Sequence, residues 1–435
     1  MWYYVDLENN MNICDIKYRK YIEILDKELV CAMGCTEPIA IAYCAAILKE
    51  TLENVPTSLR IIVSGNIIKN VKSVIVPNTN GMHGIEAAAA IGILAGDSTK
   101  KLQVIANASK EQIEKLPLYL ENTDVTIEHS DTDHTLYIEI IGKYEENYAR
   151  VIIKDAHVNV SLIEKNGKII YQNDKEIVKK DNRIEENLLS IEEIVDFANS
   201  VRIEDVKKIL DKQIEYNMAI AYEGLKNNYG ANIGKTILKY SNNDIVGYIK
   251  ALASAGSDAR MNGCEMPVVI NSGSGNQGIT ASVPVIGYAK KNNKTSEQLY
   301  RALVISNLVT IHIKNSIGKL SAYCGVVIAG AGCGAGISYL EGGNYVDISH
   351  TIVNSLAIIS GVVCDGAKSS CAAKIASSVE AGIFGYYMYK EGNEFYSGDG
   401  IVKKGVENTI KAIGELARVG MCETDKEIIH LMINE

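Results

Sequence analysis

The 435-residue chain is poor in proline, with six residues, and it contains no low-complexity tract and no long basic run. The first two absences argue against disorder, and 47% apolar with 22% charged residues is typical of a globular protein. The formal net charge is −9. Because nucleic-acid backbones attract basic surfaces, this balance argues against nucleic-acid binding. We therefore expect a folded protein whose partner is a small molecule.

We also expect no secretory leader, because no basic segment followed by an apolar one opens the given sequence. We therefore expect a cytoplasmic protein. One stretch without a charged residue covers the 19 residues 322–340 and includes five glycines. Its length would suffice for a membrane span, but no second span accompanies it and no Lys/Arg-rich flank orients it. We predict a buried, closely packed helix or loop here, and no membrane association.

The spacing of apolar residues predicts an α+β fold, in which a mainly helical catalytic lobe is interrupted by a smaller α+β lobe. Residues 1–55 carry N-terminal helices assigned to the helical lobe, 56–184 form the α+β lobe, and 185–435 return to the helical lobe. Predicted strands lie at 59–64, 71–76, 102–106, 125–128, 135–141, 149–154 and 157–163. Predicted helices lie at 38–52, 84–94, 110–115, 191–198, 203–210, 244–255, 296–309, 352–363 and 367–379.

The ten cysteines contain no C-x-x-C pair, and the seven histidines contain no H-x-x-x-H pair. These absences disfavour zinc ribbons, thioredoxin-type redox motifs and a mononuclear histidine site. In the cytoplasm ten thiols are not expected to form disulfides. The cysteines are therefore buried small apolar residues, metal ligands or redox groups.

Three cysteines directly precede predicted helices: Cys35, Cys324 and Cys364. A helix N-terminus favours the thiolate form, and three thiolates suit a metal cluster. We expect Ser321 and Asp365 to cap the helices that follow the second and third of these thiols. Each cysteine can instead be an inert buried thiol. Each also has a nearby rival that spacing alone does not exclude, and we expect the last of these to lie mid-helix: Cys31, Cys333 and Cys371.

A glycine-rich segment at 271–278 contains a formal G-x-G-x-x-G. The dinucleotide-binding interpretation is weak, because no βαβ unit follows and Pro284 interrupts the predicted helix. A tight turn remains open, as does a cradle in which loop amides with Ser and Asn side chains hold a carboxylate. Residues 77–84 have the same polar, glycine-rich composition, and His83 within them is structural or catalytic.

Four motifs in this order resemble the L-cysteine desulfidase family, whose wider relatives are the iron–sulfur L-serine dehydratases with their alpha-chain domain. They are Gly34-Cys35-Thr36-Glu37-Pro38, the 271–278 segment, Lys319-Leu320-Ser321-Ala322-Tyr323-Cys324 and Val363-Cys364-Asp365-Gly366-Ala367-Lys368. The resemblance extends from about residue 20 to about residue 425. It implies a [4Fe-4S] cluster held by Cys35, Cys324 and Cys364, with one iron left open. It also implies the conversion of L-cysteine and water into pyruvate, ammonia and hydrogen sulfide, without pyridoxal phosphate.

This chemistry requires donors for the substrate carboxylate and a base for the α-proton. The expected donors are Ser272, Ser274 and Asn276, with Asn78 and Gly81 as second candidates. Lys368 is the first choice of base, because it lies four residues after a proposed ligand, and the others are Lys314, His83 and Glu37. Either lysine can instead be solvated or ion-paired.

Three other functions remain open. L-Serine dehydratase would use the same cluster, with the open iron binding a hydroxyl. A non-catalytic iron–sulfur redox sensor belongs to a different class, as does a nicotinamide-dependent oxidoreductase using Gly273 to Gly278. The expected partner is L-cysteine, and a homo-oligomer is compatible with the sequence.

Overall fold

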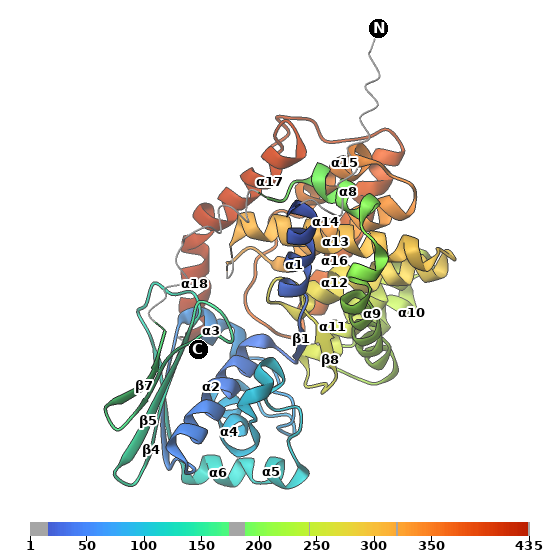
Figure 1. Cartoon of the computed structure of the whole chain (residues 1–435). Coiled ribbons are helices and arrows are strands. Elements are labelled where there is room, and N and C mark those ends of the chain that lie inside the picture. The colour runs from blue at the N-terminus through green and yellow to red at the C-terminus, as the bar shows by residue number, and fades with distance from the viewer. Residues whose placement is uncertain (1–15, 174–187, 243, 319–320, 434–435) are drawn as a thin grey trace.

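The computed structural model describes residues 16–173, 188–242, 244–318 and 321–433. It is an α+β fold that is mainly helical, as predicted, with one six-stranded sheet and one two-stranded sheet. In Figure 1 the larger sheet with its covering helices lies at the lower left, and most of the remaining helices gather above it and to its right. The boundary predicted at 184/185 lies outside the described residues, and the division into domains stays a prediction.

The two N-terminal helices pack against different parts of the chain. Helix α1 (Ile16–Glu28) contacts α9 (Ile203–Lys226) and α13 (Ser296–Ile317), in the helical region. Helix α2 (Thr36–Leu52), predicted to belong to that same region, instead packs on strands of the larger sheet and is buried along most of its length. Strand β1 (Cys31–Met33) lies between the two helices and pairs antiparallel with β8 (Pro267–Val269), which ties the start of α2 to the helical region.

The six-stranded sheet has the order β3-β2-β4-β5-β6-β7. Only β2 and β3 are parallel, and every other pair is antiparallel. Alternate residues of β2 point into the core, whereas Arg60 between them pairs with Glu128 at the surface. The strands are β2 (Ser58–Val63), β3 (Asp124–His129), β4 (Tyr137–Tyr144), β5 (Asn147–Lys154), β6 (Val160–Lys165) and β7 (Lys168–Gln172).

Two of the predicted strands in this region are wrong. Residues 71–76 form the end of a short helix and a turn, and 102–106 form the end of a 3-10 segment and the turn that follows it. Their apolar side chains are buried from turns, which periodicity does not distinguish from a short strand. The helices here are α3 (Gly65–Val71), α4 (Gly84–Ala95), η1 (Ser98–Gln103), α5 (Lys110–Glu114) and α6 (Leu116–Asn122).

The helical region is built around α14 (Gly325–Leu340), which is buried almost throughout. A Cβ on Gly330 would lie 2.3 Å from the Ser378 carbonyl oxygen, and one on Gly334 would lie 2.4 Å from that of Gly382. The glycines thus permit the close packing that the sequence predicted. No helix of the described residues is long and apolar enough to cross a membrane. Around α14 lie α8 (Ile191–Ser200), α10 (Ile233–Tyr240), α11 (Ile245–Met261), α12 (Gly275–Lys291), α15 (Tyr345–Ile358), α16 (Cys371–Lys390), α17 (Val406–Glu415), η2 (Leu416–Gly420) and α18 (Cys422–Ile433).

Several predicted helix boundaries need correction, two of them close to the proposed ligand Cys364. Helix α15 ends at Ile358 rather than 363, and α16 begins at Cys371 rather than 367. The intervening segment leaves the helical conformation because its backbone bonds to the strand-like residues before α14, with Tyr323 bridging Val363. Helix α12 continues through Pro284, which the sequence analysis took as an interruption.

Candidate active site

The N-termini of α2, α12 and α14 meet in the interior of the molecule. The Thr36 hydroxyl, at the start of α2, donates to the Gly273 carbonyl in the loop before α12 (3.0 Å). On the other side, a Cβ on Gly325, at the start of α14, would lie 2.8 Å from the Gln277 side chain of α12. The start of α12 therefore lies between the other two. Each helix start carries a partial positive charge, so their meeting favours a bound anion.

Cys35 and Cys324 are the N-cap residues of α2 and α14, each in the extended conformation that frees its side chain from the helix. Neither thiol caps a backbone N–H. The expectation that Ser321 caps the second helix is wrong, because its hydroxyl donates to the Ala417 carbonyl and accepts from Tyr323 N–H. Residues 319–320 of this motif lie outside the described residues.

Cys324 and Cys364 lie side by side on two paired extended segments. The Cys324 N–H donates to the Val362 carbonyl (3.1 Å), and the Cys364 N–H donates to the Ala322 carbonyl (2.6 Å). A hydrogen bond between the two thiols lowers the pKa of Cys364 below its ordinary value and raises that of Cys324. Lys69 favours the Cys364 thiolate as well. One proton is thus lost from this pair more easily than from an isolated buried thiol.

Cys35 reaches the same region through α3. Its sulfur lies 4.0 Å from the Asn70 carbonyl oxygen, and the preceding carbonyl, of Lys69, is so close to Gly366 that a Cβ there would lie 2.0 Å from it. The end of α3 therefore contacts both Cys35 and the loop that carries Cys364. The structure brings the three proposed ligand cysteines into one buried region.

The rival cysteines differ in their surroundings. Cys371 is the first residue of α16, not mid-helix as expected, and it packs beside Cys35 with its sulfur 3.6 Å from the Gly366 carbonyl oxygen. Cys333 lies in the middle of α14, fully buried, and burial raises the pKa of its thiol. Cys31 lies in β1 opposite Val269. Only the first of these rivals shares the site.

Buried cations surround the thiols. Lys314 of α13 is 9% exposed; burial lowers its pKa to about 8, against the opposing influence of Cys364, Cys324 and Glu37. Lys69 is 1% exposed and pairs with Asp425 of α18. Lys374 pairs with Asp365 and donates to the Val363 carbonyl (2.8 Å). Such charges would compensate thiolates that lie away from water.

Glu37 lies beside Cys35, with one carboxylate oxygen 3.0 Å from the sulfur and 3.0 Å from the Thr36 hydroxyl. Burial acts to raise the pKa of Glu37, but His157 and Cys35 outweigh it and lower that pKa to about 2. His157, whose Nε2 lies 3.7 Å from the other oxygen, comes from the β5–β6 connection. The sequence analysis missed this histidine, because nothing near it in the chain indicates a site.

The glycine-rich loop before α12 is strongly shaped. Ser272 has a φ of 50° and donates to the Asn271 side chain (2.8 Å), and Ser274 caps α12 by accepting from Gln277 N–H. The Asn276 side chain accepts from the guanidinium of Arg260 (3.1 Å), another buried residue that the sequence analysis missed. Strand β8 before the loop pairs antiparallel with β1, so the loop is not part of a parallel βαβ unit.

The remaining predicted residues lie in other surroundings. Lys368 is 27% exposed, pairs with Asp365 and donates to the Asp365 and Gly366 carbonyls. Asp365 therefore does not cap a helix from 367, as was expected. Asn78 is buried, and its side-chain amide donates to the Ile105 carbonyl (2.7 Å). Gly81 and His83 are exposed. The second glycine-rich loop thus has fewer polar groups left for a ligand than the first.

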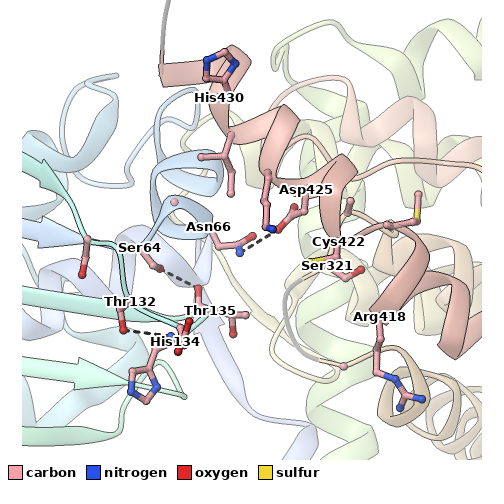
Figure 2. Close-up of a pocket in the computed structure, with 18 of the residues that line it drawn as sticks. Ser64, Asn66, Thr132, His134, Thr135, Ser321, Arg418, Cys422, Asp425 and His430 are labelled. Atoms are coloured by element: carbon pink, nitrogen blue, oxygen red, sulfur yellow. Dashed lines mark hydrogen bonds between the residues drawn. The ribbon is translucent and has the colours of Figure 1, made fainter.

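A cavity of about 660 Å³ lies on the outer side of the Cys324–Cys364 pair. Figure 2 shows its walls, formed by the start of α3, the loop after β3, Ser321 and the C-terminal helix. Ala322 lines it and accepts the Cys364 N–H, and Asp425 lines it and pairs with Lys69. The cavity therefore reaches the backbone that carries the thiols, though not the start of α12.

Among the residues that the structure describes, no three His, Cys, Asp or Glu side chains come close enough to hold a single metal ion. The donor set is nevertheless suited to an iron–sulfur cluster, because it consists of soft sulfur ligands with compensating cations around them. The chain is therefore an α+β protein whose interior is rich in thiols. Three helix starts that favour a bound anion meet in the same region.

Comparison with known proteins identifies the family. Residues 99–430 match the model of the serine dehydratase alpha chain, so the chain belongs to this family of iron–sulfur lyases. Similar relatives are the UPF0597 proteins of Desulfitobacterium hafniense, 56% identical over 97% of this chain and 98% of the relative, and of Lachnoclostridium phytofermentans, 49% identical over 96% and 100%. That of Treponema denticola is 44% identical over 98% of this chain and 100% of the relative. These relatives also cover the Cys35 motif, which lies before the family match.

Proposed function

We propose that this chain is an L-cysteine desulfidase that works without pyridoxal phosphate and converts L-cysteine and water into pyruvate, ammonia and hydrogen sulfide. The observation that carries the proposal is the meeting of Cys35, Cys324 and Cys364 beside the polar start of α12. Membership of an iron–sulfur lyase family supports the reaction class. A thiol substrate agrees with this set of residues, because thiolate is a soft ligand that suits iron.

Cys35, Cys324 and Cys364 would hold a [4Fe-4S] cluster and leave one iron without a protein ligand. Cys35 and Cys324 are buried and Cys364 is half-buried, which would limit the access of water, and Lys69 and Lys374 would compensate the negative charge. When bound, such a cluster supplies a Lewis-acidic iron that makes the substrate sulfur a better leaving group.

The chain's own residues would move the proton. Lys314 is better suited to this role than Lys368, because burial lowers its pKa to about 8, whereas Lys368 is 27% exposed. Lys314 lies among Cys324, Cys364 and Glu37. Lys314 would take the α-proton as the Cβ–S bond breaks, which releases hydrogen sulfide and aminoacrylate. The imine form of aminoacrylate then takes up water to give pyruvate and ammonia. Glu37, which lies next to Cys35, remains a candidate base. His83 is the weakest candidate base, because it is exposed.

The substrate carboxylate would bind at the start of α12. Its first backbone N–H groups lack partners within the helix, and Ser272, Ser274 and Asn276 add polar side chains around them. Asn78 and Gly81 are weaker candidates, because the amide of the first is engaged and the second is exposed.

L-Serine dehydratase is the second candidate, and the description of the matching family favours it. The same residues would serve, with a hydroxyl in place of the thiol. The difference lies in the preference of the open iron for sulfur or oxygen, which the side chains of this site do not decide.

The test is anaerobic. The protein is purified, reconstituted with iron and sulfide and cleared of free sulfide, and then given L-cysteine or L-serine in parallel. Sulfide and pyruvate are followed together, with a reconstitution mix without protein as the blank and Cys324→Ser protein as the matched control. Equal amounts of sulfide and pyruvate from L-cysteine, lost on exposure to air, are expected.

Other results would redirect the proposal. Pyruvate from L-serine alone would identify a dehydratase. A protein that keeps its cluster but forms neither product would favour the redox sensor. Equal turnover by the Cys324→Ser protein would contradict the proposed ligands.

A further inference from the structure

Arg260, near the end of α11, is 2% exposed, and no ion pair joins it to a carboxylate among the described residues. One terminal nitrogen donates to the Asn276 side chain (3.1 Å) and lies 4.0 Å from the Met261 sulfur. Its Nε has no hydrogen-bond partner. Burying a guanidinium without a counter-charge is costly. The structure thus holds a positive charge at this point without a partner of opposite sign.

The guanidinium lies against the first turn of α12. A Cβ on Gly275 would lie 2.2 Å from the Arg260 Nε, so only glycine lets the arginine approach the start of this helix so closely. The helix start adds its partial positive charge and its free N–H groups. Met261, the residue after Arg260, packs in one buried cluster with Cys35. Cation, helix start and proposed ligand thiol therefore share one place.

A buried side chain in the first turn of α12 also lacks a hydrogen-bond partner among the described residues. The Gln277 side chain is 4% exposed, its Oε1 has no donor, and it lies against Gly325, next to Cys324. A buried acceptor without a donor is as unusual as a buried cation without an anion. Gln277 lies in the first turn of α12, and Arg260 of α11 lies against that turn. Together the two groups complement the two ends of an α-amino acid, one anionic and one a hydrogen-bond donor.

We propose that Arg260 binds the α-carboxylate of the substrate and that Gln277 accepts a hydrogen bond from its α-amino group. This assignment rests on the proposed function, since it takes the substrate to be an α-amino acid whose third group is the thiol. It makes Arg260 and Gln277 the residues that select α-amino acids, and it leaves Asn276 to orient the guanidinium. Arginine suits the role, because its planar fork matches both oxygens of a carboxylate.

Two thiols that each lack one end of cysteine separate the roles. 3-Mercaptopropionate has the carboxylate but no amine, and 2-aminoethanethiol has the amine but no carboxylate. Their binding to the reconstituted protein is measured anaerobically by titration calorimetry, which needs no turnover. Arg260→Gln is expected to weaken 3-mercaptopropionate about a hundredfold, as for a lost charge-assisted pair, and to leave 2-aminoethanethiol unchanged. Gln277→Leu is expected to weaken only 2-aminoethanethiol, about tenfold.

The two variants serve as controls for each other, and iron content is measured in both. If Arg260→Gln loses its iron, Arg260→Lys decides: it should keep the iron and still bind 3-mercaptopropionate about tenfold more weakly, because the fork is gone. Equal weakening of both thiols, no weakening of either, or loss of iron from both arginine variants would overturn the assignment. Crossed binding changes in a protein that forms no pyruvate would defeat the proposed reaction but leave this assignment standing. Pyruvate formation without crossed changes would do the reverse.

Discussion

Helix α14 carries two cysteines nine positions apart, and they lie in opposite environments. Cys324, at the N-cap, has extended backbone dihedrals, neighbours Cys364 and lies near buried lysines. Cys333, in the middle of the same helix, is fully buried, and burial alone raises the pKa of its thiol. A thiol at the end of a helix can therefore interact with other polar groups, because the extended backbone there directs its side chain away from the helix.

The middle of α14 serves packing instead. Its glycines let α14 contact both α13 and α16 closely. Gly332 approaches the Thr310 hydroxyl of α13, and Gly330 approaches Ser378 of α16. In such a stripe a cysteine is one more small residue. The start of α14 therefore carries a thiol that can take part in chemistry, whereas the middle of the helix needs small residues for close packing.

The largest expected effect tests the helix start directly. Cys324→Ser should reduce the iron bound per chain more than about tenfold, because a serine hydroxyl is a poor ligand for iron in a sulfur site. Cys35→Ser and Cys364→Ser should do the same, whereas Cys333→Ser and Cys371→Ser should keep the iron. The measurement is iron and acid-labile sulfide after anaerobic reconstitution. Loss of iron from the Cys371 variant would show that this thiol at the start of α16 is a ligand.

The next effect concerns the buried lysine near the helix start. Lys314→Met should lower kcat about 10²- to 10⁴-fold, the usual contribution of a general base, and leave the bound iron unchanged. Exchange of the α-proton of L-cysteine with heavy water, followed by NMR, should slow in parallel. Lys368→Met is the matched comparison, and a larger loss from this variant would give the role of base back to Lys368.

A third change tests the middle of the helix. Gly330→Ala places a Cβ 2.3 Å from a backbone oxygen of α16, so the two helices must separate. We expect the free energy of unfolding to fall by about 2 kcal/mol, as for overpacked cores, and the iron content after reconstitution to stay the same. Thermal unfolding followed by circular dichroism measures the first, with Gly361→Ala as the control, because a Cβ there would meet nothing within 4 Å and the backbone is not left-handed. Unchanged stability would show that the glycine stripe is not needed for packing.

The smallest effect involves a helix start that carries a carboxylate instead of a thiol. Asp258 accepts from Gly234 N–H at the start of α10 (2.9 Å), and burial raises its pKa to about 6. Because the folded pKa is above the unfolded one, the carboxyl stabilises the fold in its protonated form. That stability is lost as pH rises from about 4 through about 6.

Asp258→Asn should remove this dependence. Relative to the natural protein, the variant should gain roughly 1.4 kcal/mol of stability between pH 5 and pH 7.5. Thermal unfolding at the two pH values measures it. A constant difference between the two proteins across this range would contradict the role of Asp258.

The sequence by itself determined the α+β class and the mainly helical character, because these follow from local spacing and from turn residues. It also placed Cys35 and Cys324 directly before helices, but it misplaced the start of α16, which begins at Cys371 and not directly after Cys364, and it misplaced two strands. Local patterns carry such information because a helix start depends on a few neighbouring residues.

Only the tertiary structure decided which groups face each other. Cys35 and Cys364 are brought together by α3, His157 arrives from a hairpin in the sheet, and Arg260 lies against Gly275 from another helix. Helix α2 joined the sheet rather than the helical region because its apolar surface runs all the way round and had to be buried against both sheet and helices. Contacts between distant segments depend on how the surfaces of whole elements pack, and no local pattern records that.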